Sequence, residues 1–147
     1  MEAESGKRAV KWRQAKREFK YAYMELVLRH PQFVGKIFYR VAEDTQAYHQ
    51  VMLATVASVV REAKSQDKYK ASVFIDGLPR GEVRAVGTDL RKSGIATEKV
   101  RGVRDESNAL IRLADAVAGL IREAAEGNTE ARQLRQVGER RRSLRAV

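Results

Sequence analysis

Cysteine is absent from this chain of 147 residues, and histidine and proline occur only twice each. Without cysteine there can be no disulfide framework, no thiolate metal site and no cysteine nucleophile. This composition suits a reducing compartment, and we expect a cytoplasmic protein. The apolar stretches fall far short of the roughly 20 residues that span a bilayer. No signal peptide is recognisable before the first predicted helix, so we expect no membrane association.

Several sequence patterns that support catalysis are also missing. There is no glycine loop of the kind that cradles phosphate, no nucleophile elbow and no zinc-type spacing. His30 directly precedes Pro31, where a cap or surface role is expected. His49 has no metal-ligand partner at a useful spacing. The side chains that remain as candidates for chemistry are therefore carboxylates.

Positive charge is what the chain has in excess. Twenty-nine Lys and Arg residues against nineteen Asp and Glu residues give a net charge of +10. Such a balance is typical of proteins that bind a polyanion, most often nucleic acid, although a solvated basic surface is the alternative. The charges crowd both ends of the chain, at Lys7, Arg8, Lys11, Arg13, Lys16, Arg17, Lys20, Arg132, Arg135, Arg140, Arg141, Arg142 and Arg145.

This distribution favours contacts with phosphates. Trp12 lies among lysines and arginines and could stack on a base, or it could belong to the core, as aromatic residues at helical spacing usually do. The side chains predicted to contact nucleic acid are Lys11, Trp12, Arg13, Lys16, Arg112, Arg122, Arg140 and Arg141.

Helical and strand patterns alternate along the sequence. Such alternation indicates an α/β layer arrangement with some parallel pairing. We expect residues 1–128 to form one domain and residues 129–147 to form a basic, mobile C-terminal helix or tail. Hydrophobic periodicity predicts helices at 7–29, 44–65, 80–93, 107–125 and 129–143, and strands at 33–41, 71–77 and 98–104.

Two aspartates occupy positions that suit a hard cation. Asp76 directly follows the buried strand, and ligands of α/β sheets gather beyond the carboxyl ends of the strands; the alternative is a turn aspartate before Gly77. Asp115 lies at the edge of an apolar helix stripe, where the alternative is an exposed acid paired with Arg112. Two such acids could share a divalent ion, because Mg²⁺ prefers oxygen ligands. The stripe comprises Leu110, Leu113, Ala114, Val117, Ala118 and Ile121.

Three segments resemble the domain-of-unknown-function family numbered 3800, which is regarded as ribonuclease H-like. They are "VFIDG", the later "RDESNALIRLADAVAGLIRE", and "VKWRQAKREFKYAYMELVLRHPQFVGKIFYRV" upstream. The resemblance spans roughly residues 9–125. It implies a ribonuclease H-like mixed sheet with flanking helices. In the "LIRLADAVAG" run, Arg112 stands where the family usually has glutamine.

The resemblance also implies a metal-dependent nuclease site. Asp76 falls on the family's strand-borne metal position and Asp115 on its helix-borne one, with Mg²⁺ or Mn²⁺ as the ion. Asp105 or Glu106 would be an accessory acid, although N-capping explains both equally well. In ribonuclease H-like enzymes, one or two such ions activate a water and stabilise the leaving oxygen during phosphodiester hydrolysis.

Other acids of the family pattern are missing. Ala3 stands at the aspartate of the usual Asp-Glu-Ser-Gly turn, and Ala9 precedes the Lys-Trp pair where an acid is often found. We therefore expect a domain that lacks the family's first two strands and cleaves nucleic acid poorly or not at all. The alternatives are a non-catalytic nucleic-acid-binding module and a protein-interaction subunit. Exposed sheet edges predict a homodimer or a second chain that completes the sheet.

Overall fold

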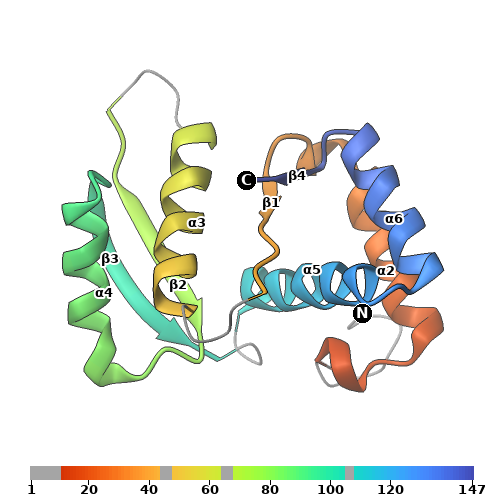
Figure 1. The fold of residues 1–147 in the computed structure, drawn as a ribbon, viewed down its shortest axis with the longest axis horizontal. Coiled ribbons are helices and arrows are strands. Elements are labelled where there is room, and N and C mark those ends of the chain that lie inside the picture. Colours follow the sequence, from red (N-terminus) through yellow and green to blue (C-terminus); the bar gives the residue numbers. More distant parts are fainter. Residues whose placement is uncertain (1–10, 44–47, 64–67, 105–107) are drawn as a thin grey trace.

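The computed structural model describes residues 11–43, 48–63, 68–104 and 108–147, and it shows an α/β protein with helices and strands in two groups (Figure 1). The α5 lobe contains α2, α5, α6, β1 and β4, and the α4 lobe contains α3, β2, α4 and β3. In chain order the elements are η1 (Trp12–Gln14), α2 (Arg17–Arg29), η2 (Pro31–Phe33), β1 (Ile37–Tyr39), α3 (Tyr48–Ala63), β2 (Ala71–Asp76), α4 (Arg80–Lys92), β3 (Thr97–Val103), α5 (Ala109–Ala125), α6 (Thr129–Arg140) and β4 (Leu144–Ala146).

The α4 lobe is built on a crossover between parallel strands. β2 pairs with β3 in a register that aligns Ala71 with Thr97 and Asp76 with Val103. Parallel strands need a long connection, and α4 supplies it. Val86, Leu90 and Ile95 form the buried centre of this lobe, and half-buried apolar residues of α3 and both strands pack around it. In α3 itself none of the described residues is fully buried.

The α5 lobe holds the larger core. Helix α5 begins after Asn108, whose side chain accepts hydrogen bonds from the backbone amides of Leu110 and Ile111, as an N-cap residue does. Asn128 caps α6 in the same way through Ala131. Helices α2, α5 and α6 enclose the core cluster of Trp12, Tyr21, Met24, Val27, Leu28, Ile37, Ala116, Val117, Leu120, Ile121, Ala124, Ala131, Leu134 and Leu144.

The C-terminal segment is packed into this lobe. A Cβ atom at Gly138 would lie 2.9 Å from side-chain atoms of both Leu28 and Leu144, so α6 meets α2 and β4 at a point where only glycine fits. Ser143 is buried, and its hydroxyl donates to the backbone oxygen of Leu28 at 2.6 Å. β4 then pairs in parallel with β1, with Ile37 opposite Leu144. Residues 129–147 thus contribute to the same core as α2 and α5.

Two contacts, one from Arg40 and one from Arg145, join the two lobes through α3. Arg40, just beyond β1, donates to the Ser58 hydroxyl at 3.0 Å and to the backbone oxygen of Val147 at 2.9 Å. Arg145 of β4 forms an ion pair with Glu62 at 3.0 Å. Both contacts are polar, in contrast to the apolar core within each lobe.

Several sequence predictions need correction. The strands of the described residues form two separate parallel pairs, β1–β4 and β2–β3, in place of one mixed sheet. The strand predicted at 33–41 is only Ile37–Tyr39, because Pro31–Phe33 forms a 3-10 turn. The helix predicted at 7–29 is interrupted between η1 and α2. Among the described residues, no helix has the length and apolar character to cross a bilayer.

Candidate functional site

Asp115 contacts the segment that contains Trp12. Its Oδ2 accepts a hydrogen bond of 3.0 Å from the Trp12 backbone amide, a residue 103 positions away in the sequence. One turn further along α5, a Cβ atom at Gly119 would lie 2.1 Å from the Trp12 ring. Two turns along, Glu123 Oε1 accepts from Trp12 Nε1 at 3.0 Å. Residues four apart share one face of a helix, so Asp115, Gly119 and Glu123 form a continuous seat for Trp12.

Glu123 is the polar centre of this seat. Besides the Trp12 indole, it accepts hydrogen bonds from the Lys20 ammonium group at 2.6 Å and from the Tyr21 hydroxyl at 2.5 Å. The Lys20 nitrogen also lies 4.9 Å from the centroid of the Trp12 ring, within cation–π range. Tyr21 meets the same ring edge to face, with 5.9 Å between the centroids. The half-buried carboxylate therefore joins α2, η1 and α5.

These contacts shift two pKa values. Burial by itself would raise the pKa of Glu123, but the hydrogen bonds from Lys20, Tyr21 and Trp12 outweigh it and lower that pKa below its ordinary value. The pKa of Tyr21 is raised, first by burial and then by its hydrogen bond to Glu123. The glutamate is therefore ionised and the tyrosine protonated at neutral pH. This is the charge state that the hydrogen bonds require.

Asp76 lies where the sequence predicts it, as the last residue of β2, and its side chain is exposed. It belongs to the α4 lobe, whereas Asp115 faces the Trp12 segment of the α5 lobe. Asp105 and Glu106 lie outside the described residues. No group of three or more His, Cys, Asp or Glu side chains that could hold a metal ion occurs in the described part of the chain.

Among the described residues, Asp76 and Asp115 alone do not make a complete ligand set for Mg²⁺ or Mn²⁺. A hard cation needs several oxygen ligands around it. Asp115 already gives one oxygen to a backbone amide, and Asp76 is carried by the other lobe. The metal site stays a prediction.

The predicted nucleic-acid contacts occupy different environments. Trp12 is only 1% exposed, which favours the core alternative, because its ring faces are covered by Lys20, Tyr21 and Gly119. Arg112 is half-buried and has a partner. The remaining predicted contacts have exposed side chains and carry their charge at the surface: Lys11, Arg13, Lys16, Arg122, Arg140 and Arg141.

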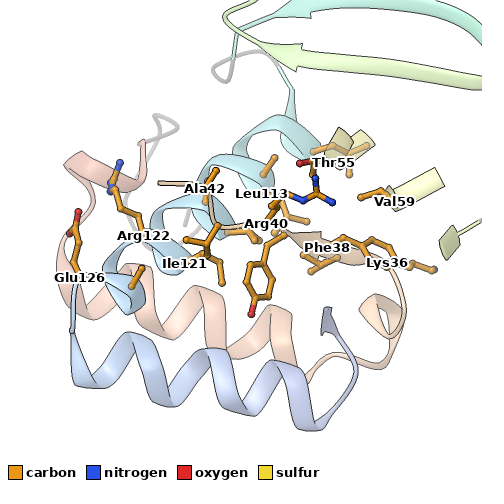
Figure 2. A pocket seen from close by; sticks show the side chains of 18 of the residues that line it. Lys36, Phe38, Arg40, Ala42, Thr55, Val59, Leu113, Ile121, Arg122 and Glu126 are labelled. Carbon is orange, nitrogen blue, oxygen red and sulfur yellow. The ribbon is translucent and has the colours of Figure 1, made fainter. Parts of the chain in front are cut away.

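A cleft of about 910 Å³ lies between α5, β1 and α3 (Figure 2). The apolar stripe predicted on α5 lines this cleft, and Leu110 at its start is 73% exposed. The core face of α5 is offset from the predicted one and includes Ile111, Ala116, Leu120 and Ala124. The helix thus has two apolar faces. The helical periodicity of the apolar residues does not show which of the two faces is covered by other elements.

Charged side chains lie at the two ends of the cleft. Figure 2 shows Arg122 and Glu126 at one end and Lys36 and Arg40 towards the other. The volume is in the range of small-molecule sites, which combine apolar walls with a few polar groups. The sequence did not predict this cleft, because the α5 wall lies more than 50 residues beyond the walls from β1 and α3.

Comparisons of the chain with family models, with curated proteins and with solved structures found no match.

Proposed function

We propose that this protein binds nucleic acid through the sugar–phosphate backbone, and that it is a ribonuclease H-like domain that does not hydrolyse its ligand on its own. The observation that carries the proposal is the net charge of +10 combined with the exposure of the basic side chains. Contacts between Lys or Arg and phosphates supply most non-specific affinity for nucleic acid. Exposed basic side chains occur in both lobes, among them Arg13, Lys16, Lys36, Arg80, Arg84, Arg101, Arg122, Arg132, Arg140 and Arg142.

The surface ion pairs leave this excess charge largely available. Arg17 pairs with Glu130, Arg29 with Glu25 and Arg145 with Glu62. Exposed pairs of this kind are worth at most about 1 kcal/mol. Because there are ten more basic than acidic residues, such pairing cannot neutralise the surface.

The test is the salt dependence of binding. Fluorescence anisotropy with labelled single-stranded DNA, single-stranded RNA and duplex DNA would be measured between 50 and 300 mM salt. We expect the logarithm of the association constant to fall linearly with the logarithm of the salt concentration, with a slope of about −0.7 to −0.9 per phosphate contacted. Absence of binding to all three ligands at the lowest salt concentration would reject the proposal.

One specific observation favours metal-dependent cleavage as a second candidate function. Asp76 ends β2 at the carboxyl edge of a parallel pair, the edge at which α/β proteins bind their ligands. Saturable Mn²⁺ binding, lost in both Asp76→Asn and Asp115→Asn, would support it. Asparagine at 115 keeps an oxygen that can accept the Trp12 amide, so the variant tests the charge with the seat intact. We expect no Mg²⁺-dependent cleavage by the chain alone.

The expectation of a homodimer, or of a second chain that completes the sheet, also stays a proposal. The supporting observation is that β1–β4 and β2–β3 each contain only two strands among the described residues. Sheets of this size leave strand edges that can accept another strand. Sedimentation velocity over a 100-fold range of concentration would reveal self-association, and a single species of about 16.6 kDa throughout would exclude the homodimer.

A further inference from the structure

Three segments of the α5 lobe bring basic side chains together where α6 ends. The arginine turn, which we define as Arg140, Arg141 and Arg142, begins at the last residue of α6 and leads towards β4. The Gly35 amide donates to the Arg142 backbone oxygen at 2.8 Å, which places Lys36 beside the turn. The Arg141 guanidinium donates to the Arg29 backbone oxygen at 2.9 Å. The turn is therefore held against the end of α2 and the start of β1.

Two acids on the adjoining helices, Glu25 of α2 and Glu139 of α6, are already engaged. Glu25 pairs with Arg29, and Glu139 accepts a hydrogen bond from the Tyr39 hydroxyl and lies near Arg135. Within the described residues, no ion pair involves Lys36, Arg140 or Arg142, and all three are exposed. The end of α6 therefore presents positive charge that no neighbouring carboxylate cancels.

Arg142 adopts a backbone conformation that costs free energy. Its φ is +58°, and it is the one described non-glycine residue with a positive φ. The Ser143 amide bonds to the Gly138 oxygen and the Arg142 amide to the Glu139 oxygen. This is the pattern of a helix end at which glycine is strongly preferred. The other four positive φ values belong to glycines: Gly35, Gly77, Gly94 and Gly127.

Helix electrostatics explain only part of this arrangement. Positive charge near a helix C-terminus is stabilising, and Arg140 and Arg141 already provide it there. The dipole does not require an arginine at the one position where its backbone is strained. Strained residues that persist in a fold tend to cluster at functional sites.

We infer that the arginine turn, together with Lys36, is a phosphate-binding surface that contacts the backbone of a nucleic acid. The inference rests on the proposed nucleic-acid binding and assigns it to one surface of the molecule. Guanidinium groups suit this task, because they bind phosphate oxygens through paired N–H donors. The arginine turn lies outside residues 9–125, and the proposed surface contains none of the carboxylates predicted to bind a metal ion.

The experiment compares two double variants that remove the same charge. Arg140→Gln with Arg142→Gln alters the proposed surface, and Arg80→Gln with Arg84→Gln removes two exposed arginines from α4 in the other lobe. Binding of a labelled single-stranded DNA would be followed by anisotropy across a salt series. The slope of binding against salt concentration gives the number of phosphates contacted. We expect this number to fall by about two in the first variant and by less than one in the second.

The possible outcomes separate the inference from the proposed function. If wild type binds and both double variants lose affinity equally, the arginine turn has no special role and the inference is wrong. If wild type does not bind nucleic acid, the proposed function fails, and the inference fails with it. Unlabelled poly-glutamate and unlabelled nucleic acid would also be compared as competitors of the labelled DNA. If poly-glutamate displaces the DNA as effectively per charge as nucleic acid does, the inference is wrong. Unchanged circular dichroism and thermal midpoint in both variants would confirm that the fold is intact.

Discussion

Asp115 shows how the role of one side chain depends on a distant partner. On α5 alone it is an acid at the edge of an apolar stripe, and neither a metal ligand nor a partner for Arg112 can be excluded by spacing. In the structure its carboxylate accepts the Trp12 amide. The spacing of Asp115, Gly119 and Glu123 was visible in the sequence, but the tryptophan that it seats lies more than 100 positions away. No local pattern predicts that pairing.

Glu123 is expected to make stability depend on pH. Its folded-state pKa is lowered by hydrogen bonds that outweigh the effect of burial. Its contribution is therefore fully present above the unfolded pKa of about 4.5, and is lost as the pH falls through the lower folded value. Glu123→Gln should lose about 1–3 kcal/mol at pH 7, because an amide cannot accept all three donors. Urea unfolding between pH 3 and pH 7 would measure this.

The matched control for Glu123 is Glu126→Gln, an exposed acid at the end of the same helix. It should change the free energy of unfolding by less than about 0.5 kcal/mol. A pH profile for Glu123→Gln parallel to that of wild type below pH 4.5 would show that this carboxylate is not linked to folding.

Gly119 should tolerate no side chain, because Trp12 lies directly against it. Alanine is a better helix former by about 1 kcal/mol, yet its Cβ would lie 2.1 Å from Trp12 Cδ1. We expect Gly119→Ala to be destabilising by about 2 kcal/mol or more through displacement of the ring. Trp12 is the only tryptophan in the chain, so its fluorescence reports the displacement directly.

Gly81 in α4 provides the comparison for this substitution. A Cβ atom there meets nothing within 4 Å, so Gly81→Ala should be neutral or mildly stabilising. Equal stability and an unshifted tryptophan spectrum in Gly119→Ala would contradict the seat described above.

At the scale of elements, some helices and strands follow from the local sequence pattern, whereas others depend on contacts with distant segments. The helices predicted at 80–93 and 107–125 and the strands predicted at 71–77 and 98–104 match α4, α5, β2 and β3 within about two residues. Each of these segments has its own hydrophobic periodicity and is bounded by residues that start or end an element. The break between η1 and α2 follows Trp12, which α5 holds through contacts that are distant in sequence. β4 contains three residues, too few for a period to appear, and it exists because β1 lies beside it.

The end of α6 allows a direct test of backbone strain. Arg142→Gly should stabilise the protein by about 1 kcal/mol, since glycine adopts a φ of +58° without the steric cost that arginine incurs. Thermal unfolding of Arg142→Gly would be compared with that of Arg140→Gly. Arg140 is the last helical residue, so glycine should be destabilising there. Destabilisation by Arg142→Gly would mean that contacts of the side chain outweigh the strain.

At the scale of the whole molecule, the two lobes differ in how much they bury. The α5 lobe has a contiguous core of fully buried residues from α2, α5 and α6, whereas the α4 lobe centres on Val86, Leu90 and Ile95. The contacts between the lobes include the polar links of Arg40 and Arg145 to α3. The sequence predicted one domain up to residue 128 and a separate tail. It could not indicate that the tail completes the larger core, because the apolar positions of α6 are few.

Hydrogen exchange should reflect this unequal burial. Segments with few buried apolar contacts open locally at lower free energy than the core does. We therefore expect the amides of α5 between Ile111 and Ala124 to exchange at least 10-fold more slowly than those of α3, in which no described residue is fully buried. Ser58→Ala, which removes the hydroxyl bonded to Arg40, should speed exchange in α3 and leave α5 unchanged. Equal protection in both lobes, or an equal response of both to this substitution, would show that the chain unfolds as a single cooperative unit.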